Sequence, residues 1–225
     1  MLRERLRAFI QSPSGTLEAP VSSRLSEPNG EERAPAQSEF APRNSNGLDQ
    51  FFSYIKGASG LSILDLAGVN QANVSFITNL GHKIYSEDFL RSVRLSANGD
   101  PHPRPEAFFK HNLNHPDDTF DGALVWDVLE YLNAPMLTAT VDRLSRIVKP
   151  GSYVFAVFQA QEKVDSVPQY TFRIRDSKTL MVAERGRRKP EQVFNNRSLE
   201  KLFHDFESLK FFLARDKLRE VIVRR

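Results

Sequence analysis

Two acidic side chains lie where apolar stretches end, and their spacing is that of a nucleoside site. Asp65 ends the apolar run "LSIL", and Glu87 ends "HKIYS" about 20 residues later. In dinucleotide-binding folds, an acidic residue at that offset accepts hydrogen bonds from the ribose hydroxyls. The pair therefore indicates a ligand that contains a nucleoside, although a solvated strand end would also explain Glu87.

A third acid, Asp127, directly follows the apolar run "ALVW". A carboxylate placed after a buried strand needs solvent, a cation or hydrogen-bond donors around it. Ligands of open α/β sheets bind at the carboxyl ends of the strands, so Asp127 is a candidate for the same site. The preceding Trp126 either stacks on a ligand or packs in the core. Core packing is the favoured interpretation, because large aromatic side chains stabilise chiefly through buried area.

Strand-like and helix-like segments alternate from Leu48 onward, which is typical of a parallel sheet covered by helices. The predicted strands are "LSILDLA", "HKIYSED", "EAFFKHN", Ala123–Trp126 and "SYVFAVF". The predicted helices are "LDQFFSYIKG", "NVSFITNLG" and "PMLTATVDRLSRIVKPG", with Gly or Pro-Gly at their ends. The pattern predicts an α/β fold, specifically a Rossmann-like three-layer α/β/α sandwich.

The last third of the chain has a different pattern. "YTFRIRDSKTLMVAE" predicts a hairpin beside the site. The basic segment Arg185–Lys189 after it covers the mouth of a pocket, attracts an anionic substrate, or is a solvated charged loop, and the loop is the favoured interpretation. "RSLEKLFHDF" predicts a helix with Ser198 as its N-cap. "LKFFLARDKLREVIVRR" predicts two strands joined at residues 215–217, which would close the sheet with an antiparallel edge.

Composition divides the 225 residues into a disordered tail, residues 1–47, and one domain, residues 48–225. The tail is rich in Ser, Pro, Glu and Gly, and such a composition buries too little apolar surface to offset the entropy of ordering. A short amphipathic helix is predicted at its start, over Leu2–Gln11.

Several functional classes are disfavoured by the same composition. The chain has no cysteine, which excludes disulfides and thiolate chemistry, and its histidines stand at proline-interrupted spacings, so we expect no metal site. The net charge of +3 is spread along the chain and gives no specific sign of nucleic-acid binding. No apolar run reaches the ~18 residues that span a bilayer. We therefore expect a cytoplasmic protein with no transmembrane segment.

Two central motifs resemble those of a known enzyme family. "FDGALVWDVLEYL" is followed by a helix that ends in "LSRIVKPG". This combination resembles the class I S-adenosylmethionine-dependent methyltransferase family, in particular its type 11-like members. The resemblance covers about residues 48–225. It implies a mostly parallel seven-stranded sheet with an antiparallel C-terminal edge strand, S-adenosyl-L-methionine as cofactor, and methyl transfer to a small-molecule acceptor by in-line displacement.

The first loop departs from the family pattern. That pattern resembles D/E-x-G-x-G-x-G, and here Asp65 matches the acid while Ala67, Val69 and Gln71 stand at the glycine positions. Glycine serves there because it tolerates unusual dihedral angles and lets the backbone approach a ligand. Gly68 is the one glycine of "AGVNQAN". Val69 is the larger departure, since a β-branched residue does not readily adopt a positive φ.

Three interpretations of this loop stay open. The loop is rebuilt, with Asn70, Gln71 and Asn73 contacting the cofactor; or the site is closed and the chain is a non-catalytic binding or scaffold module; or a different small ligand binds in the same crevice. The resemblance also places Asn112 near the adenine amino group. It implies a cofactor site made of Asp65, Ala67, Gly68, Asn70, Gln71, Glu87, Asn112 and Asp127. It identifies no catalytic residue.

Overall fold

The computed structural model describes residues 39–96, 104–160, 165–214 and 216–225. Most of the predicted tail, with its amphipathic helix, lies outside these ranges. The first described elements are β1 (Ala41–Asn44) and α1 (Asn46–Ile55), and both begin before Leu48. The domain therefore starts earlier than the boundary that composition predicted. No helix among the described residues is long and apolar enough to cross a membrane.

The main sheet confirms the predicted fold class. Its strand order is β3-β2-β4-β5-β9-β8. The pairs β2–β3, β2–β4 and β4–β5 are parallel, whereas β9 is antiparallel to both β5 and β8. A parallel sheet thus ends in an antiparallel edge, as expected. The strands are β2 (Ser62–Asp65), β3 (Lys83–Ser86), β4 (Phe120–Trp126), β5 (Val148–Gln159), β8 (Ser208–Leu213) and β9 (Leu218–Arg224).

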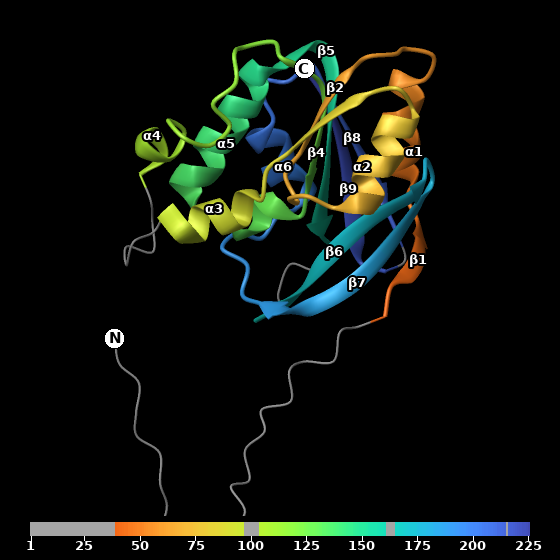
Figure 1. Cartoon of the computed structure of the whole chain (residues 1–225). Helices are drawn as coiled ribbons and strands as arrows, with labels where there is room; N and C mark the ends of the chain where they lie inside the picture. The colour runs from red at the N-terminus through yellow and green to blue at the C-terminus, as the bar shows by residue number, and fades with distance from the viewer. Residues whose placement is uncertain (1–38, 97–103, 161–164, 215) are drawn as a thin grey trace, which may run out of the picture. The chain divides into compact units, whose positions relative to one another are not determined.

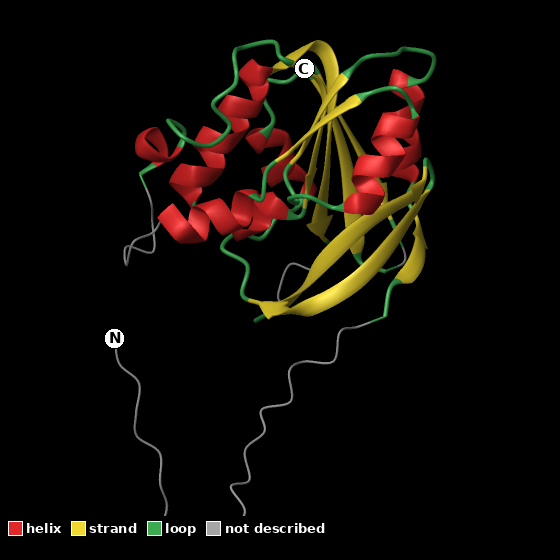
Figure 2. Ribbon diagram, in the orientation of Figure 1, coloured by secondary structure: helices red, strands yellow, loops and turns green. Residues whose placement is uncertain are grey.

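Helices cover both faces of this sheet (Figures 1 and 2). α1 and α2 (Gln71–Asn79) pack on the face that carries Ile63, Leu124 and Phe155. The opposite face carries Leu64, Val125 and other apolar residues, which pack against a second group of helices. Successive side chains of a strand point to opposite faces, so the apolar runs of β2 and β4 supply both cores. The second group is α3 (Phe89–Ser96), α4 (Pro105–Phe108), α5 (Ala134–Ile147) and α6 (Asn196–Leu202).

One predicted strand is absent. "EAFFKHN" was expected to form a strand, but α4 and a following turn occupy it, so the main sheet has six strands among the described residues and not seven. Pro105 opens this helix, where its fixed φ suits the first turn. Phe108 is buried with its ring edge-on to Phe89. A short apolar run is compatible with either a strand or a helix, and here the aromatic packing favours the helix.

A second, three-stranded sheet has the order β1-β7-β6. The predicted hairpin is confirmed as β6 (Val167–Asp176) and β7 (Thr179–Arg188), and it packs against α2. The third strand, β1, was not predicted and pairs antiparallel with β7. The helix after the hairpin is also confirmed, but its N-cap is Asn195, and Ser198 lies at the third helical position, where the two residues form a capping box.

A buried ion pair joins β1 to β9 of the main sheet. The Glu220 carboxylate on β9 accepts a hydrogen bond from the Gly47 N–H at 2.7 Å and pairs with the Arg43 guanidinium. The side chains of Arg43 and Glu220 are only 9% and 2% exposed. Arg43 also pairs with Asp216. A charge buried to this degree is tolerated only while its partners are in place.

We expect Arg43→Met to lower the free energy of unfolding by about 3–5 kcal/mol, because it leaves the Glu220 charge buried with a single backbone donor. Urea denaturation of both proteins measures the difference. The matched control is Arg175→Met, whose pair with Asp176 is about half exposed; it should change the stability by less than about 1 kcal/mol. Equal losses in the two variants would contradict the assignment of β1 as an anchored strand.

Candidate functional site

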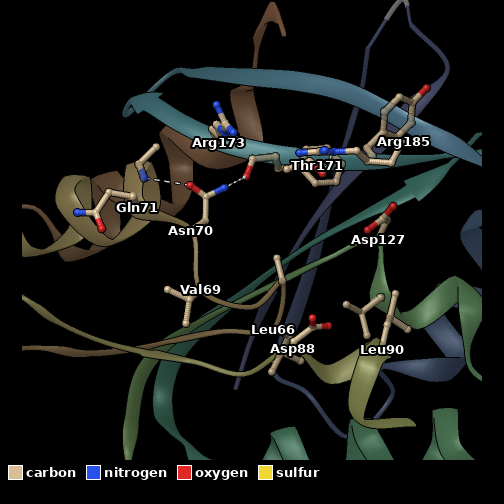
Figure 3. A pocket seen from close by; sticks show the side chains of 15 residues that line it. Leu66, Val69, Asn70, Gln71, Asp88, Leu90, Asp127, Thr171, Arg173 and Arg185 are labelled. Carbon is tan, nitrogen blue, oxygen red and sulfur yellow. Dashed lines mark hydrogen bonds between the residues drawn. The ribbon is translucent and has the colours of Figure 1, made fainter. Parts of the chain in front are cut away.

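A cavity of about 490 Å³ lies at the carboxyl ends of β2 and β4, between the first loop and the β6–β7 hairpin (Figure 3). Its size is within the range of ~300–1,000 Å³ that is usual for small-molecule sites. The carboxyl ends of parallel strands are also where open α/β sheets bind ligands. The lining residues that matter below are Ala67, Val69, Asn70, Gln71, Asp88, Asp127, Thr171, Arg173 and Arg185.

Asp65 does not line this cavity but holds the residues around it in place. The side chain is fully buried, and its two oxygens accept hydrogen bonds from Trp126 Nε1 at 2.7 Å, the Ala67 N–H at 3.0 Å and Asn73 Nδ2 at 3.2 Å. Burial raises the pKa of this carboxyl, and the three donors oppose that shift. Asp65 therefore fixes the loop, the end of β4 and the start of α2 in one arrangement.

Trp126 is a core residue, as the favoured interpretation predicted. It is fully buried, and its ring stacks on Phe172 of β6 at 5.3 Å between centroids and 10° between planes. Its φ of 57° is rare for a bulky side chain. The hydrogen bond to Asp65 and the stacking on Phe172 stabilise this conformation. Since the chain turns at Trp126, the next residue, Asp127, comes to line the cavity.

Gly68 is the position in the first loop that requires glycine. Its φ is +83°, and a Cβ added there would lie 3.0 Å from Cβ of Asp88. Its N–H donates to the Glu87 carbonyl at 3.1 Å, which brings the loop against the end of β3. Val69 is not among the residues with a positive φ; the residue is 82% exposed and lines the cavity. The expected conformational conflict at Val69 is therefore absent.

The asparagines of the loop hold the edge of the hairpin. Asn70 Nδ2 donates to the Phe172 carbonyl at 3.3 Å, and Asn73 Oδ1 accepts from the Ile174 N–H at 2.8 Å. Both partners lie on β6, the edge strand of the smaller sheet. Asn70 also caps α2 by accepting from the Ala72 N–H at 3.0 Å. Asn70 and Gln71 line the cavity, whereas Asn73 is fully buried behind it.

Glu87, the acid that the sequence placed on a ribose, points away from the cavity. Its oxygens accept from the Leu113 N–H at 3.1 Å and contact His115 Nε2 at 2.9 Å. The adjacent Asp88 lines the cavity in its place, and its Oδ1 caps α3 by accepting from the Arg91 N–H at 3.1 Å. Asp88 is a lining residue that was not predicted from the sequence. The signal was present in "SED", which has two acids at the end of one strand.

Asp127 is the expected acid that the structure does place in the cavity. Burial raises its pKa to about 6, although the Tyr170 N–H and the Tyr131 hydroxyl, 3.4 Å away, both donate to it and oppose this rise.

Asn112 is not in the cavity; its Nδ2 donates to the Phe108 carbonyl at 2.9 Å. Glu130 lies near Asp127 but outside the cavity lining, accepts from the Gln159 N–H at 2.6 Å, and has its pKa raised by burial to about 8.

The structure thus brings together only part of the site expected from the sequence. Ala67, Asn70, Gln71 and Asp127 line the cavity. Asp65, Gly68, Glu87 and Asn112 surround it and contact other parts of the protein. The hairpin supplies residues that the sequence did not single out for this site, among them Thr171 and Arg173. The basic segment was interpreted as a loop after the hairpin, but β7 continues through it to Arg188, and its Arg185 lines the cavity.

Comparison with known proteins gives a distant likeness in fold. Neither a protein-family model nor a curated protein matches the sequence. A SAM-dependent methyltransferase from Archaeoglobus fulgidus is 13% identical, with a TM-score of 0.48 over 79% of this chain and 91% of that chain. One from Methanosarcina mazei is 15% identical, with a TM-score of 0.45 over 77% of this chain and 96% of that one.

A third similar structure contains ligands. It is 1,6-didemethyltoxoflavin-N1-methyltransferase from Burkholderia thailandensis with bound 1,6-didemethyltoxoflavin and S-adenosylhomocysteine. It is 11% identical, with a TM-score of 0.45 over 80% of this chain and 76% of that chain. Identities this low carry no information about the ligand or the reaction of this chain. The fold class rests on the strand order and directions described above.

We expect Asn73→Ala to release the edge of the hairpin. The substitution leaves the Ile174 N–H and one oxygen of Asp65 buried without a partner, which should cost about 2–4 kcal/mol in unfolding free energy. Hydrogen exchange at the Ile174 amide should accelerate markedly, and denaturation gives the energy. Gln71→Ala is the matched control, because the Gln71 side chain is exposed and its Nε2 donates to the nearby Ser75 hydroxyl on the same helix. An unchanged Ile174 exchange rate would contradict this role of Asn73.

Proposed function

We propose that this chain binds S-adenosylmethionine in the cavity between the first loop and the hairpin, and transfers its methyl group to a small-molecule acceptor. The observation that carries the proposal is the position of the cavity. It lies on the loop after β2 and next to the acids that end β3 and β4. That position agrees with the resemblance of "FDGALVWDVLEYL" and "LSRIVKPG" to methyltransferase motifs.

The residues around the cavity fit this cofactor. Asp88 is exposed and lines the cavity, so its carboxylate can accept hydrogen bonds from a ribose diol in the role first expected of Glu87. Asp127 is a buried carboxylate, and a cationic ligand beside it would relieve the cost of its burial. S-adenosylmethionine carries a sulfonium charge. Val69 adds an apolar wall beside the loop.

The bound cofactor would supply a methyl group already activated by its sulfonium. The protein then has mainly to align the attacking atom of the acceptor and to exclude water. The hairpin serves this purpose as a wall of the cavity opposite the strand ends. Asp127, with a pKa of about 6, is largely ionised at neutral pH. It can therefore accept the proton that a nitrogen or oxygen acceptor loses when the new bond forms.

The first test is calorimetry with S-adenosylmethionine and S-adenosylhomocysteine. We expect micromolar binding to the unmodified protein. Asp88→Asn should weaken it roughly 10- to 100-fold, because hydrogen bonds to a charged group contribute about 1.5–3 kcal/mol. Glu87→Gln is the matched control on the neighbouring residue. Its side chain faces the 113–115 turn, so binding should stay within about threefold of the unmodified protein.

Failure to bind at millimolar concentrations would overturn the proposal in favour of a second function, a non-catalytic methyltransferase-like module. The contacts of Asn70 and Asn73 with β6 support that alternative, because both amides are used within the protein. The Val69 side chain also projects at the cavity wall. The variant Val69→Gly distinguishes a blocked cofactor site from a site that never bound the cofactor. If only this variant binds S-adenosylmethionine, the Val69 side chain blocks the site.

We expect cofactor affinity to depend on pH through Asp127. Above its pKa of about 6 the carboxylate is charged and attracts a cationic ligand; as the pH falls from 7 to 5 it is protonated and the attraction is lost. The dissociation constant of S-adenosylmethionine should therefore rise across this range. Asp127→Asn should remove the dependence, while Asp142→Asn, at an exposed position on α5, should retain it. A pH dependence unchanged in Asp127→Asn would assign it to another group.

A further inference from the structure

We propose that Arg173 and Arg185 form an oxyanion-binding site at the hairpin side of the cavity, and that the methyl acceptor is an anion such as a carboxylate. The second part rests on the proposed function. Both arginines line the cavity, Arg173 from β6 and Arg185 from β7. Figure 3 shows them along the hairpin, across the cavity from Asp88 and Asp127.

Contacts with Thr171 of β6 and with Phe40, the residue before β1, position the two guanidinium groups. Arg185 Nε donates to Thr171 Oγ1 at 2.7 Å. The Arg173 guanidinium carbon lies 3.8 Å from the ring centroid of Phe40, and that of Arg185 lies 5.8 Å from the same centroid. Both guanidinium groups thus contact the same aromatic ring. The hydrogen bond to Thr171 uses the Nε donor of Arg185, so its two Nη groups keep the geometry that binds a carboxylate.

Neither arginine is neutralised by a carboxylate among the ion pairs of the described residues. Two other arginines of the hairpin are paired, Arg175 with Asp176 at 3.4 Å and Arg187 with Glu184 at 3.7 Å. Two unneutralised cations beside one aromatic ring repel each other, and a bound anion relieves that repulsion. Arginine is also the side chain best suited to bind planar oxyanions with two hydrogen bonds. The hairpin therefore offers a positive site next to an otherwise acidic cavity.

The separation of charge across the cavity gives the acceptor an orientation. The strand-end side carries Asp88 and Asp127, which suit a ribose and a cation, while the hairpin side carries Arg173 and Arg185. An acceptor with an anionic group would place that group on the hairpin. Its opposite end would then lie toward Asp127. Acceptors without a negative charge would lose this anchor, so the two arginines would determine specificity.

The experiment titrates the full chain with benzoate and with benzamide, its uncharged analogue, and follows backbone amide shifts by NMR without cofactor. We expect millimolar benzoate binding with shifts at Thr171 and Arg173, and much weaker benzamide binding. Arg173→Gln and Arg185→Gln should each weaken benzoate binding about 10-fold. Arg175→Gln, a matched change on the same hairpin, should leave it unchanged.

Three results would overturn the anion site: no benzoate binding at millimolar concentrations, equal binding of benzamide, or an equal loss in Arg175→Gln. Calorimetry with S-adenosylmethionine on the same variants keeps this test separate from that of the proposed function. Cofactor binding should persist in Arg173→Gln and Arg185→Gln, because the ribose and sulfonium contacts proposed for Asp88 and Asp127 lie on the strand-end side of the cavity. Benzoate binding without cofactor binding would retain the anion site and reject the methyltransferase proposal; the reverse would reject the anion site alone.

Discussion

The buried carboxylate of Asp65 is the constraint on which the rest of the site depends. A fully buried acid is stable only if donors surround it, and here the donors come from three different segments: the first loop, the end of β4 and the start of α2. Asn73 extends the network to Ile174 of the hairpin. One side chain therefore sets the loop, the turn at Trp126 and the position of the small sheet relative to the strand ends.

That network has a consequence for the cavity. An edge strand with unpaired N–H and C=O groups tends to pair with other chains, and β6 avoids this because asparagine side chains from the loop and α2 bond to its edge. The same bonds hold the hairpin over the strand ends, where it forms one wall of the cavity. Protection of the edge and formation of the cavity thus follow from one set of contacts. Asp127 contributes to both effects: it lines the cavity, and it accepts a hydrogen bond from the Tyr170 N–H of β6.

The sequence predicted the elements that have strong local patterns and missed those defined by distant partners. The long apolar runs of β4 and β5 and the apolar stripe of α5 were sufficient for the fold class. By contrast, β1 reads "APRN" and has no apolar pattern, because its stability comes from β7 and from Glu220 on β9. Glu87 and Asp88 are neighbours at the end of one strand, and which of them faces the cavity depends on the local turn. Composition cannot resolve that choice.

The absence of the usual glycines is less restrictive than the sequence suggested. The loop needs a positive φ only at Gly68, where the glycine is present, so the residues at the other family positions cost no backbone strain. Val69 instead changes the space that a ligand can occupy at the cavity wall. The residue is 82% exposed there, and a ligand that covered it would bury apolar surface, which is favourable by about 25 cal/mol for each Å². A valine in this place can therefore serve as a contact for a ligand that fits beside it, and excludes only a ligand that must lie directly on the loop backbone.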